Sequence, residues 1–347
     1  MSGIISELRK EGIAVVGAGG SGDVVSAFVF CKVVRDLLSI EKCVPVAVLW
    51  ERWSLDPYPG PIPRSLIRNA EVRRCVYVGP DTYVERCGGD YVFRPHAAIV
   101  AELYGDVVPA VTLELGVCGV VKCLRELVDS GFKYVVALDV GGDILASGYE
   151  ESLWSPLADS LILAAVSEFN SLVAVLAPGA DGELPQDCVM SRIGEVMSKG
   201  GYVGALGLWR EYAGLYEKVL PETRTEASRV PYEALLGHLG TKSMRKGTRR
   251  VQITPLSPLI FLLKTSTVLQ LNKLAQELKK TRSLADALKT AEELGIPTEL
   301  HLEIEIAKKY GCGPESLKAN INTQEVRKII RERIIQITKN LKEPVTT

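Results

Sequence analysis

Histidine and paired cysteines are what this sequence most clearly lacks. Its 347 residues include only three histidines, His96, His238 and His301, and none has a metal-ligand or nucleophile-elbow spacing. The eight cysteines form no C-x-x-C pair, which excludes a zinc ribbon. A zinc hydrolase or a Ser–His–Asp enzyme would have to draw on these few residues. Because most cysteines stand among apolar neighbours, we expect buried thiols without a disulfide framework.

An excess of charge and a long apolar run are also missing. The 41 basic residues nearly cancel the 42 acidic ones, which argues against nucleic acid as a partner. No run reaches the roughly 18 apolar residues of a transmembrane helix, and the first residues do not resemble a signal peptide. We therefore expect a cytoplasmic protein without membrane contact.

Short apolar runs alternate with helical patterns over the first two thirds of the chain. This alternation is typical of a parallel sheet with helices on both faces. The sequence therefore predicts an α/β fold with a Rossmann-like, three-layer, parallel or mostly parallel sheet. The expected strands are residues 12–20, 44–50, 73–79, 91–93, 108–116, 134–142, 171–179 and 202–208. The expected helices are residues 21–38, 97–104, 117–130, 156–169 and 187–198.

The last third of the chain has a different composition. No Asp or Glu occurs between residues 241 and 276, and beyond this point apolar residues follow helical spacing. We divide the chain into a Rossmann-like ligand-binding domain, residues 1–239, and a helical C-terminal region packed on it, residues 240–347. The many Leu and Ile residues of that region indicate a contact for a homo-oligomer. Its expected helices are residues 259–279, 283–294, 297–310 and 323–341.

The strongest motif is GAGGSGD, which follows a predicted strand and opens a helix. Backbone N–H groups and the helix dipole favour anions at such a place. Gly17, Gly19 and Gly22 fit the spacing G-x-G-x-x-G, and Glu51 follows the second strand as in a dinucleotide fold. Asp23 argues against a pyrophosphate, because a carboxylate at about 4 Å would repel it by roughly 1–4 kcal/mol. We expect Asp23 to bind hydroxyls, an amine or a metal, or simply to begin the helix.

Two further loops carry acids at the ends of predicted strands. DVGGD places Asp139 and Asp143 after one strand, and APGADGE places Asp181 after the next. In SPLAD, which lies between them, Ser155 can cap the following helix and Asp159 falls in its first turn. Capping accounts for Ser155 but not for the acids of the two loops.

The loops after parallel strands open at the same edge of a sheet. We therefore expect Asp23, Asp139, Asp143 and Asp181 to meet there. Packed carboxylates require a cation, protons or ligand donors. With so few histidines, Mg²⁺ is the expected metal, held by Asp23, Asp139 and Asp143, which are also the candidate catalytic residues.

The candidate cofactor-binding residues come mostly from the first glycine loop, where we expect a phosphate cradle. They are Gly17, Gly19, Gly20, Ser21, Gly22, Glu51 and Asp181. The basic segment KSMRKGTRR, residues 242–250, is either a solvated connector or a phosphate clamp or RNA contact. If this segment folds over the edge of the sheet, it supplies the cations that the aspartates lack.

The motifs GAGGSGD, DVGGDILASG and SPLAD, with APGADGE behind them, resemble the archaeal domain-of-unknown-function 1152 family. The resemblance covers most of the chain, from Gly12 to the C-terminal helices. It implies a cytoplasmic prokaryotic α/β protein and brings no assigned activity. DVGGDILASG also resembles the Gly–Gly–acid stretch of glutamate-cyclase-like lyases, in which Asp139 and Asp143 would be the shared acids.

Three functions fit these features. The leading one is a Mg²⁺-dependent hydrolase or transferase that converts a small phosphorylated or nucleotide-like metabolite at the glycine and aspartate loops. The second is an NAD(P)-type dinucleotide-binding oxidoreductase, which G-x-G-x-x-G and Glu51 support. The third is a non-enzymatic homo-oligomeric or RNA-binding protein that uses the basic segment.

Overall fold

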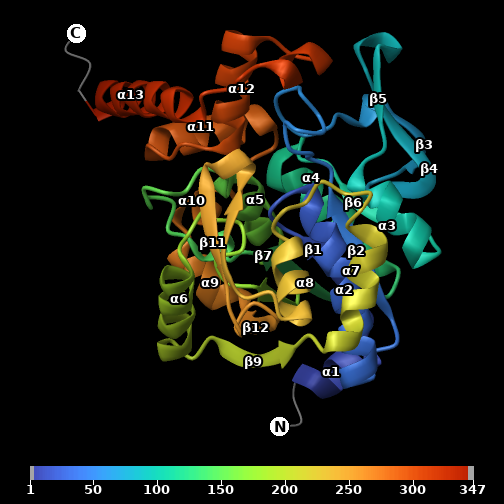
Figure 1. The fold of residues 1–347 in the computed structure, drawn as a ribbon. Coiled ribbons are helices and arrows are strands. Elements are labelled where there is room, and N and C mark those ends of the chain that lie inside the picture. Colours follow the sequence, from blue (N-terminus) through green and yellow to red (C-terminus); the bar gives the residue numbers. More distant parts are fainter. Residues whose placement is uncertain (1–3, 343–347) are drawn as a thin grey trace.

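A mixed β-sheet forms the centre of the protein (Figure 1), and the computed structural model describes residues 4–342. Five parallel strands occupy the middle of the sheet in the order β6-β2-β1-β7-β8. The chain thus builds outward from β1 in both directions, as in Rossmann-like sheets, and the expected α/β fold is confirmed. The bounds are β1 Ile13–Gly17, β2 Cys43–Val48, β6 Val108–Val111, β7 Tyr134–Val140 and β8 Ser171–Leu176.

Antiparallel strands extend the sheet at both edges. On one side β4 pairs with β6, and β3 and β5 pair with β4. On the other side β12 pairs with β8, and β9 pairs with β12. A separate hairpin joins β10 to β11. The bounds are β3 Ile67–Val72, β4 Val76–Arg86, β5 Tyr91–Phe93, β9 Tyr202–Gly207, β10 Gly240–Met244, β11 Arg249–Ile253 and β12 Leu259–Lys264.

The helix predicted for residues 259–279 is wrong at its first part. LIFLLK is the strand β12, inserted between β8 and β9, and helices begin only at Thr265. A short continuous apolar run fits a buried strand as well as a helix, and here the free backbone edges of β8 and β9 decide the outcome. Residues 240–264 are therefore strands and turns, so this part of the predicted helical region is corrected. The domain boundary at residue 240 itself stays a prediction.

Alternate residues of each central strand enter two different hydrophobic cores. In β1, Ile13 and Val15 pack in the core beneath α2, α3, α7 and α8, whereas Ala14 and Val16 pack in the core beneath α4, α5, α6 and α10. The sheet is thus covered on both faces, which confirms the three expected layers. The bounds are α2 Val24–Leu38, α3 His96–Tyr104, α4 Gly116–Asp129, α5 Pro156–Val166, α6 Gln186–Ser198, α7 Ala213–Val219, α8 Arg229–Leu236, α9 Thr265–Leu271 and α10 Lys273–Leu278.

The last three helices form a separate group at the top of Figure 1, in orange and red. They are α11 Leu284–Leu294, α12 Glu299–Tyr310 and α13 Thr323–Lys342, and α1 Ile4–Lys10 lies at the opposite end. A small apolar cluster around Trp154 joins α12 to α13. The predicted cap of α11 is confirmed, because the Ser283 side chain accepts the N–H of Asp286 at 3.0 Å. Within residues 4–342, no helix combines the length and apolar character needed to cross a membrane.

The cysteines depart from the expectation. Two disulfides are present: Cys31–Cys43 joins α2 to β2, and Cys75–Cys123 joins the start of β4 to α4. These four residues are buried as expected, but the expected absence of disulfides is wrong. The partners are 12 and 48 residues apart, and only the packing of a helix on the sheet brings them into range. The other four cysteines are free and at least partly exposed.

Candidate functional site

The candidate site lies at the carboxyl edge of the parallel strands, the place where ligands bind in this type of sheet. A cavity of about 590 Å³ opens there between the strand-end loops and the C-terminal helices. All four aspartates predicted to converge line this one cavity. Its carboxylic residues are Asp23, Asp139, Asp143, Asp181, Glu183, Glu226, Glu299 and Glu303, and its arginines are Arg52, Arg224, Arg245, Arg249 and Arg327.

The loop after β7 turns on two glycines that residues with side chains could not easily replace. Gly141 and Gly142 have φ angles of 137° and 102°, in the left-handed region. A Cβ atom on Gly141 would lie 2.0 Å from Oδ2 of Asp181. The glycine therefore lets a carboxylate from the β8 loop lie directly against the β7 loop, beside Asp143.

Asp139, Asp143 and Asp181 form a tight carboxylate cluster, in which one oxygen of each lies within 4.8 Å of the others. Oδ1 of Asp181 accepts the N–H of Glu183 at 2.7 Å, whereas the buried Oδ2 has no hydrogen-bond partner among the described residues. Burial and repulsion between the carboxylates raise the pKa of Asp139 and of Asp143 well above the usual value, and burial raises the pKa of Asp181 to about 6. The cluster therefore has the donors and the spacing that suit a hard cation.

The first glycine loop uses its amides inside the protein. Oδ2 of Asp23 accepts the N–H groups of Gly19 at 3.0 Å and of Val140 at 3.3 Å. The N–H of Ser21 donates to the carbonyl oxygen of Trp50 at 3.1 Å. The Asp23 carboxylate thus takes the place that a bound anion has in other glycine loops. The phosphate cradle expected here stays a prediction, and these hydrogen bonds do not favour it.

Close packing accounts for the other glycines of this loop. A Cβ atom on Gly17 would lie 2.7 Å from the backbone nitrogen of Val24, and one on Gly22 would lie 2.8 Å from Oγ1 of Thr225. Gly20 has a φ angle of 113°. Strand, loop and helix can therefore meet this closely only without side chains. Gly22 also lines the cavity.

Glu51 is enclosed in a hydrogen-bond network. Its Oε1 accepts the Ser21 hydroxyl at 2.5 Å and the N–H of His96 at 2.8 Å, and its Oε2 lies 2.8 Å from Nδ1 of His96. Nε2 of His96 accepts the N–H of Arg224 at 3.0 Å, which leaves the ring hydrogen on Nδ1. Burial alone would raise the pKa of Glu51, but His96 and the hydrogen bonds outweigh it and hold the pKa below its usual value. Glu51, the acid that a dinucleotide fold would need, is thus held within the protein: its Oε1 accepts two hydrogen bonds, and its Oε2 lies against the His96 ring without a hydrogen-bond partner among the described residues.

The start of α5 is capped from a distant element rather than by Ser155. The Ser155 hydroxyl donates to Glu183 at 2.8 Å and makes no cap. Glu299 of α12 instead accepts the N–H groups of Leu157 at 3.0 Å and of Ala158 at 2.8 Å. The predicted Ser155 cap is therefore wrong, because a carboxylate brought by the tertiary fold interacts more strongly with the helix N-terminus.

Asp159 extends the carboxylate cluster beneath the first loop. It is 1% exposed, and neither of its oxygens has a hydrogen-bond partner among the described residues. A Cβ atom on Gly19 would lie 3.5 Å from both Asp159 oxygens and 2.9 Å from Oδ2 of Asp23, so the two acids flank the same glycine. Burial, together with repulsion by Asp139 and Asp23, raises the pKa of Asp159 well above its usual value. The position of Asp159 in the first turn of a predicted helix did not indicate that it belongs to the carboxylate cluster.

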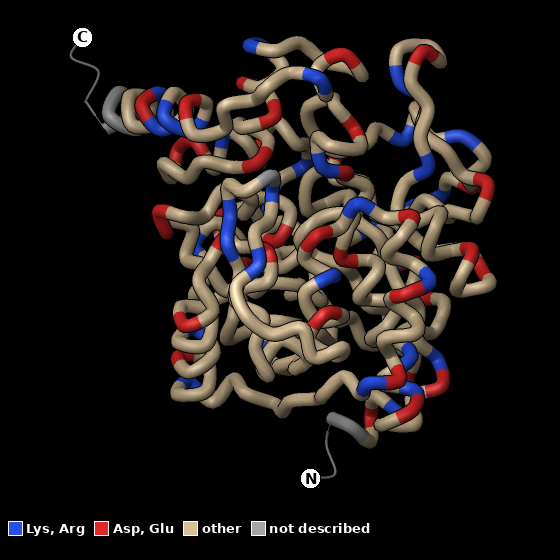
Figure 2. Tube along the Cα trace, viewed as in Figure 1, with Lys and Arg blue, Asp and Glu red and all other residues tan. Residues whose placement is uncertain are grey.

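Arginines from the basic segment line the same cavity (Figure 2 shows basic residues on both strands of the hairpin). Arg249 donates to the carbonyl oxygen of Asp181 at 2.9 Å and forms an ion pair with Glu183. Burial and repulsion by other arginines lower the pKa of Arg245 to about 10. The segment thus folds over the edge of the sheet, which is the arrangement in which it would supply cations to the aspartates. Its function as a connector, a phosphate clamp or an RNA contact stays a prediction.

Several residues of the cavity were missed by sequence reasoning. Arg52, Glu299, Glu303 and Arg327 belong to no recognisable motif. Arg52 directly follows Glu51, which was its only signal, and its guanidinium donates to the carbonyl oxygen of Gly19 at 2.7 Å.

Residues 14–307 match the family described as "Protein of unknown function (DUF1152)". This match confirms the family resemblance of the motifs. No curated protein and no solved structure matches the chain.

Proposed function

We propose that this chain, which belongs to the DUF1152 family of proteins of unknown function, binds a divalent cation and converts a small phosphorylated metabolite by hydrolysis or group transfer. The cation, Mg²⁺ in the first place, would be held by Asp139, Asp143 and Asp181. The observation that carries the proposal is the carboxylate cluster within 4.8 Å, in a cavity that also holds arginines.

The balance of charge in the cavity supports a cation at the cluster. Eight carboxylic side chains and five arginines line the cavity, and three of the acids lie close together and are buried. Buried like charges are costly unless protons or a cation compensate them. Oδ2 of Asp181 has no hydrogen-bond partner among the described residues, and all three members of the cluster offer carboxylate oxygens, the ligand atoms that Mg²⁺ prefers.

The arginines supply the second half of the proposed site. Guanidinium groups bind phosphate in a planar, two-pronged geometry, and Arg245 and Arg249 line the cavity that the carboxylates line. A phosphate group between the arginines and the carboxylate cluster would be neutralised by the guanidinium groups on one side and by the bound cation on the other. A bound divalent ion would polarise a phosphoryl oxygen or make a water molecule more acidic. The protein's own contribution is to fix the carboxylates on rigid strand ends and to limit the entry of water.

The other two candidate functions receive less support. A dinucleotide would need the first loop and Glu51, but Asp23 fills the anion position and Glu51 is held by Ser21 and His96. An RNA surface would need outward-facing cations, whereas Arg245 and Arg249 line the internal cavity.

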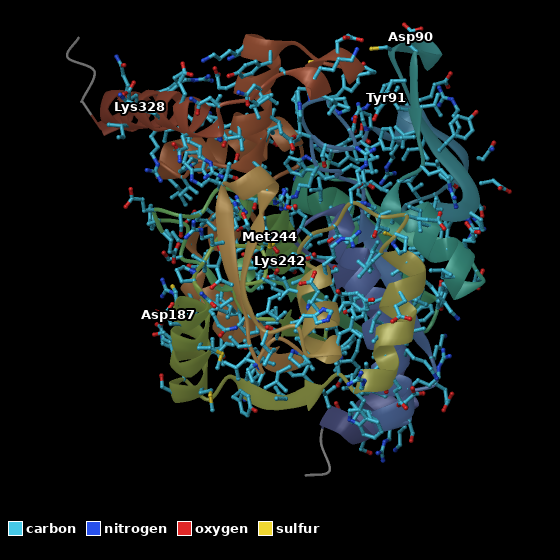
Figure 3. The ribbon with its side chains drawn as sticks, in the orientation of Figure 1. Asp90, Tyr91, Asp187, Lys242, Met244 and Lys328 are labelled. Carbon is cyan, nitrogen blue, oxygen red and sulfur yellow. A yellow bond between two sulfur atoms is a disulfide. The ribbon has the colours of Figure 1, made fainter. Side chains whose placement is uncertain are left out.

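Metal binding to the purified full chain is the direct test. We would titrate Mn²⁺ as a paramagnetic substitute for Mg²⁺ and follow the free ion by electron paramagnetic resonance. The wild type should bind the ion, and Asp143→Asn should lose it. Asp187→Asn is the matched control, because Asp187 is an exposed aspartate on α6, at the left of Figure 3.

The second part of the test adds nucleotides and sugar phosphates with Mg²⁺ and measures heat and phosphate release. Asp143→Asn should abolish the signal that the wild type gives, and Asp187→Asn should retain it. If the wild type binds no Mn²⁺ at millimolar concentration, with or without these compounds, the proposed function is wrong.

A further inference from the structure

A second cavity of about 730 Å³ adjoins the first and is strongly basic. Five cationic side chains line it against two carboxylates, Glu151 and Glu332. The cations are Arg249, Arg250, Arg327, Lys328 and Arg331. They come from the β10–β11 hairpin and from α13, which carries Lys328 in Figure 3. The two cavities share part of their lining, which consists of Trp154, Thr248, Arg249 and Arg327.

Arg327 stands at the junction of the two cavities. Its guanidinium lies 4.8 Å from the centre of the Trp154 ring, and its buried Nε has no hydrogen-bond partner among the described residues. No ion pair is formed by Arg327 within the part of the chain that the structure describes. Burial and repulsion by Arg249 lower the pKa of Arg327 to about 10. The protein therefore places a poorly compensated cation where an anion could reach it.

The neighbouring cations are held in position by the protein's own acids. Arg249 pairs with Glu183, and Arg331 is bound to the side chain and carbonyl oxygen of Glu151. Arg331 also lies 5.0 Å from the centre of the Trp154 ring. Guanidinium groups fixed by ion pairs and by stacking on an aromatic ring lose little further freedom when they bind a ligand.

We infer that the second cavity binds phosphate groups and that the substrate is an oligophosphate, with at least two phosphoryl groups, that spans both cavities. This inference rests on the proposed function, since it identifies the class of its substrate. One phosphoryl group lies near Asp139, Asp143 and Asp181, where the reaction takes place. The rest of the anionic chain passes Trp154 and Arg327 into the basic cavity. A single orthophosphate reaches only one of the two, so the longer anion binds more tightly.

The test uses inorganic tripolyphosphate as the probe, with orthophosphate for comparison, in calorimetric titrations of the full chain with Mg²⁺ and with EDTA. The wild type should bind tripolyphosphate in both conditions and more tightly than orthophosphate. Arg327→Gln, which keeps contact with Trp154, should weaken tripolyphosphate binding about tenfold or more, as loss of a charged hydrogen-bond donor implies. Arg250→Gln, at an exposed position of the same cavity, should weaken it less and is available if Arg327→Gln does not fold.

Two control variants separate this inference from the proposed function. Lys289→Gln, on α11 and 76% exposed in its side chain, should leave binding unchanged. Asp143→Asn should remove the effect of Mg²⁺ but keep tripolyphosphate binding in EDTA. If Asp143→Asn keeps its Mn²⁺, the proposed function fails and the basic cavity stands. The oligophosphate inference is overturned if Arg327→Gln and Arg250→Gln bind tripolyphosphate as tightly as the wild type does. It is also overturned if Lys289→Gln weakens binding as much as Arg327→Gln does, or if the wild type gives no heat with tripolyphosphate.

Discussion

Two glycine–aspartate loops end neighbouring parallel strands, and their aspartates behave differently. In the loop after β1, Asp23 accepts the backbone N–H groups of Gly19 and Val140 and closes the loop on itself. In the loop after β7, Asp139 accepts the N–H of Ile144 at 3.0 Å, and two left-handed glycines turn the chain so that Asp143 lies close to Asp181, whose Oδ2 has no hydrogen-bond partner among the described residues. Similar motifs thus give a closed loop and an open one. The hydrogen bonds of each carboxylate, rather than the motif, decide whether a loop can receive a ligand.

The largest effect that we expect is on the pH dependence of stability and concerns Glu303, a buried acid. Glu303 binds Trp50, whose carbonyl oxygen accepts the N–H of Ser21 in the closed loop. Glu303 of α12 accepts the indole N–H of Trp50 at 3.0 Å and the N–H of Gly60 at 2.8 Å. Burial raises the pKa of Glu303 from 4.5 to about 8. The folded protein therefore holds an extra proton between these pH values. Its contribution to stability is complete below about pH 4.5 and is lost as the pH rises toward about 8.

A shift of this size corresponds to a loss on the order of 5 kcal/mol in the free energy of unfolding. Urea denaturation at a series of pH values should show a decline in the wild type to which Glu303 and the buried aspartates all contribute, and Glu303→Gln should reduce its slope without removing it. Glu277→Gln, at a half-exposed position on α10, is the control and should retain the wild-type slope. An unchanged slope in Glu303→Gln would show that the folded protein does not hold an extra proton on Glu303.

The open loop should be most sensitive at Gly141. Gly141→Ala places a Cβ atom 2.0 Å from the Asp181 carboxylate, at a φ angle of 137°. Strain and overpacking together should lower the free energy of unfolding by about 3 kcal/mol and remove Mn²⁺ binding. Gly194→Ala in α6 meets no atom within 4 Å and should be neutral or slightly stabilising. Thermal unfolding of both variants checks this, and equal stability of the two would contradict the packing argument.

The aspartates at the strand ends could be predicted from the sequence because their positions follow from local patterns. Apolar runs identified the central strands, and the rule that loops after parallel strands share one edge brought Asp23, Asp139, Asp143 and Asp181 together. The same patterns could not separate the closed loop from the open one. That difference depends on backbone groups such as the N–H of Val140, which belongs to a neighbouring strand.

The rest of the site could not be foreseen because distant segments build it. Glu299 caps α5 from a helix more than a hundred residues later, and Arg327 reaches Trp154 from α13. The strand β12 has an apolar run that fits either kind of element, and only its neighbours β8 and β9 make it a strand. Interactions of this kind leave no periodicity in the sequence.

The closed loop can be broken by removing its internal acceptor. Asp23→Ala leaves the N–H groups of Gly19 and Val140 buried without that acceptor, which should cost about 2 kcal/mol in the free energy of unfolding. Asp23→Asn keeps an oxygen at this position and should recover most of the loss. Chemical denaturation measures both. If Asp23→Asn is as unstable as Asp23→Ala, the charge rather than the hydrogen bonds holds the loop.

The smallest effect that we expect is a gain in the free energy of unfolding, and it concerns the open loop after β7. Asp143→Asn replaces one of the crowded carboxylates by an amide that can donate to Asp181, so the metal-free protein in EDTA should gain about 1 kcal/mol in stability. Excess Mn²⁺ should then stabilise the wild type but not this variant, because only a protein that binds the ion gains from it. Denaturation curves with and without the ion give both quantities. A loss of stability in EDTA would mean that Asp143 holds the fold together as Asp23 does, and the two loops would then differ in degree and not in kind.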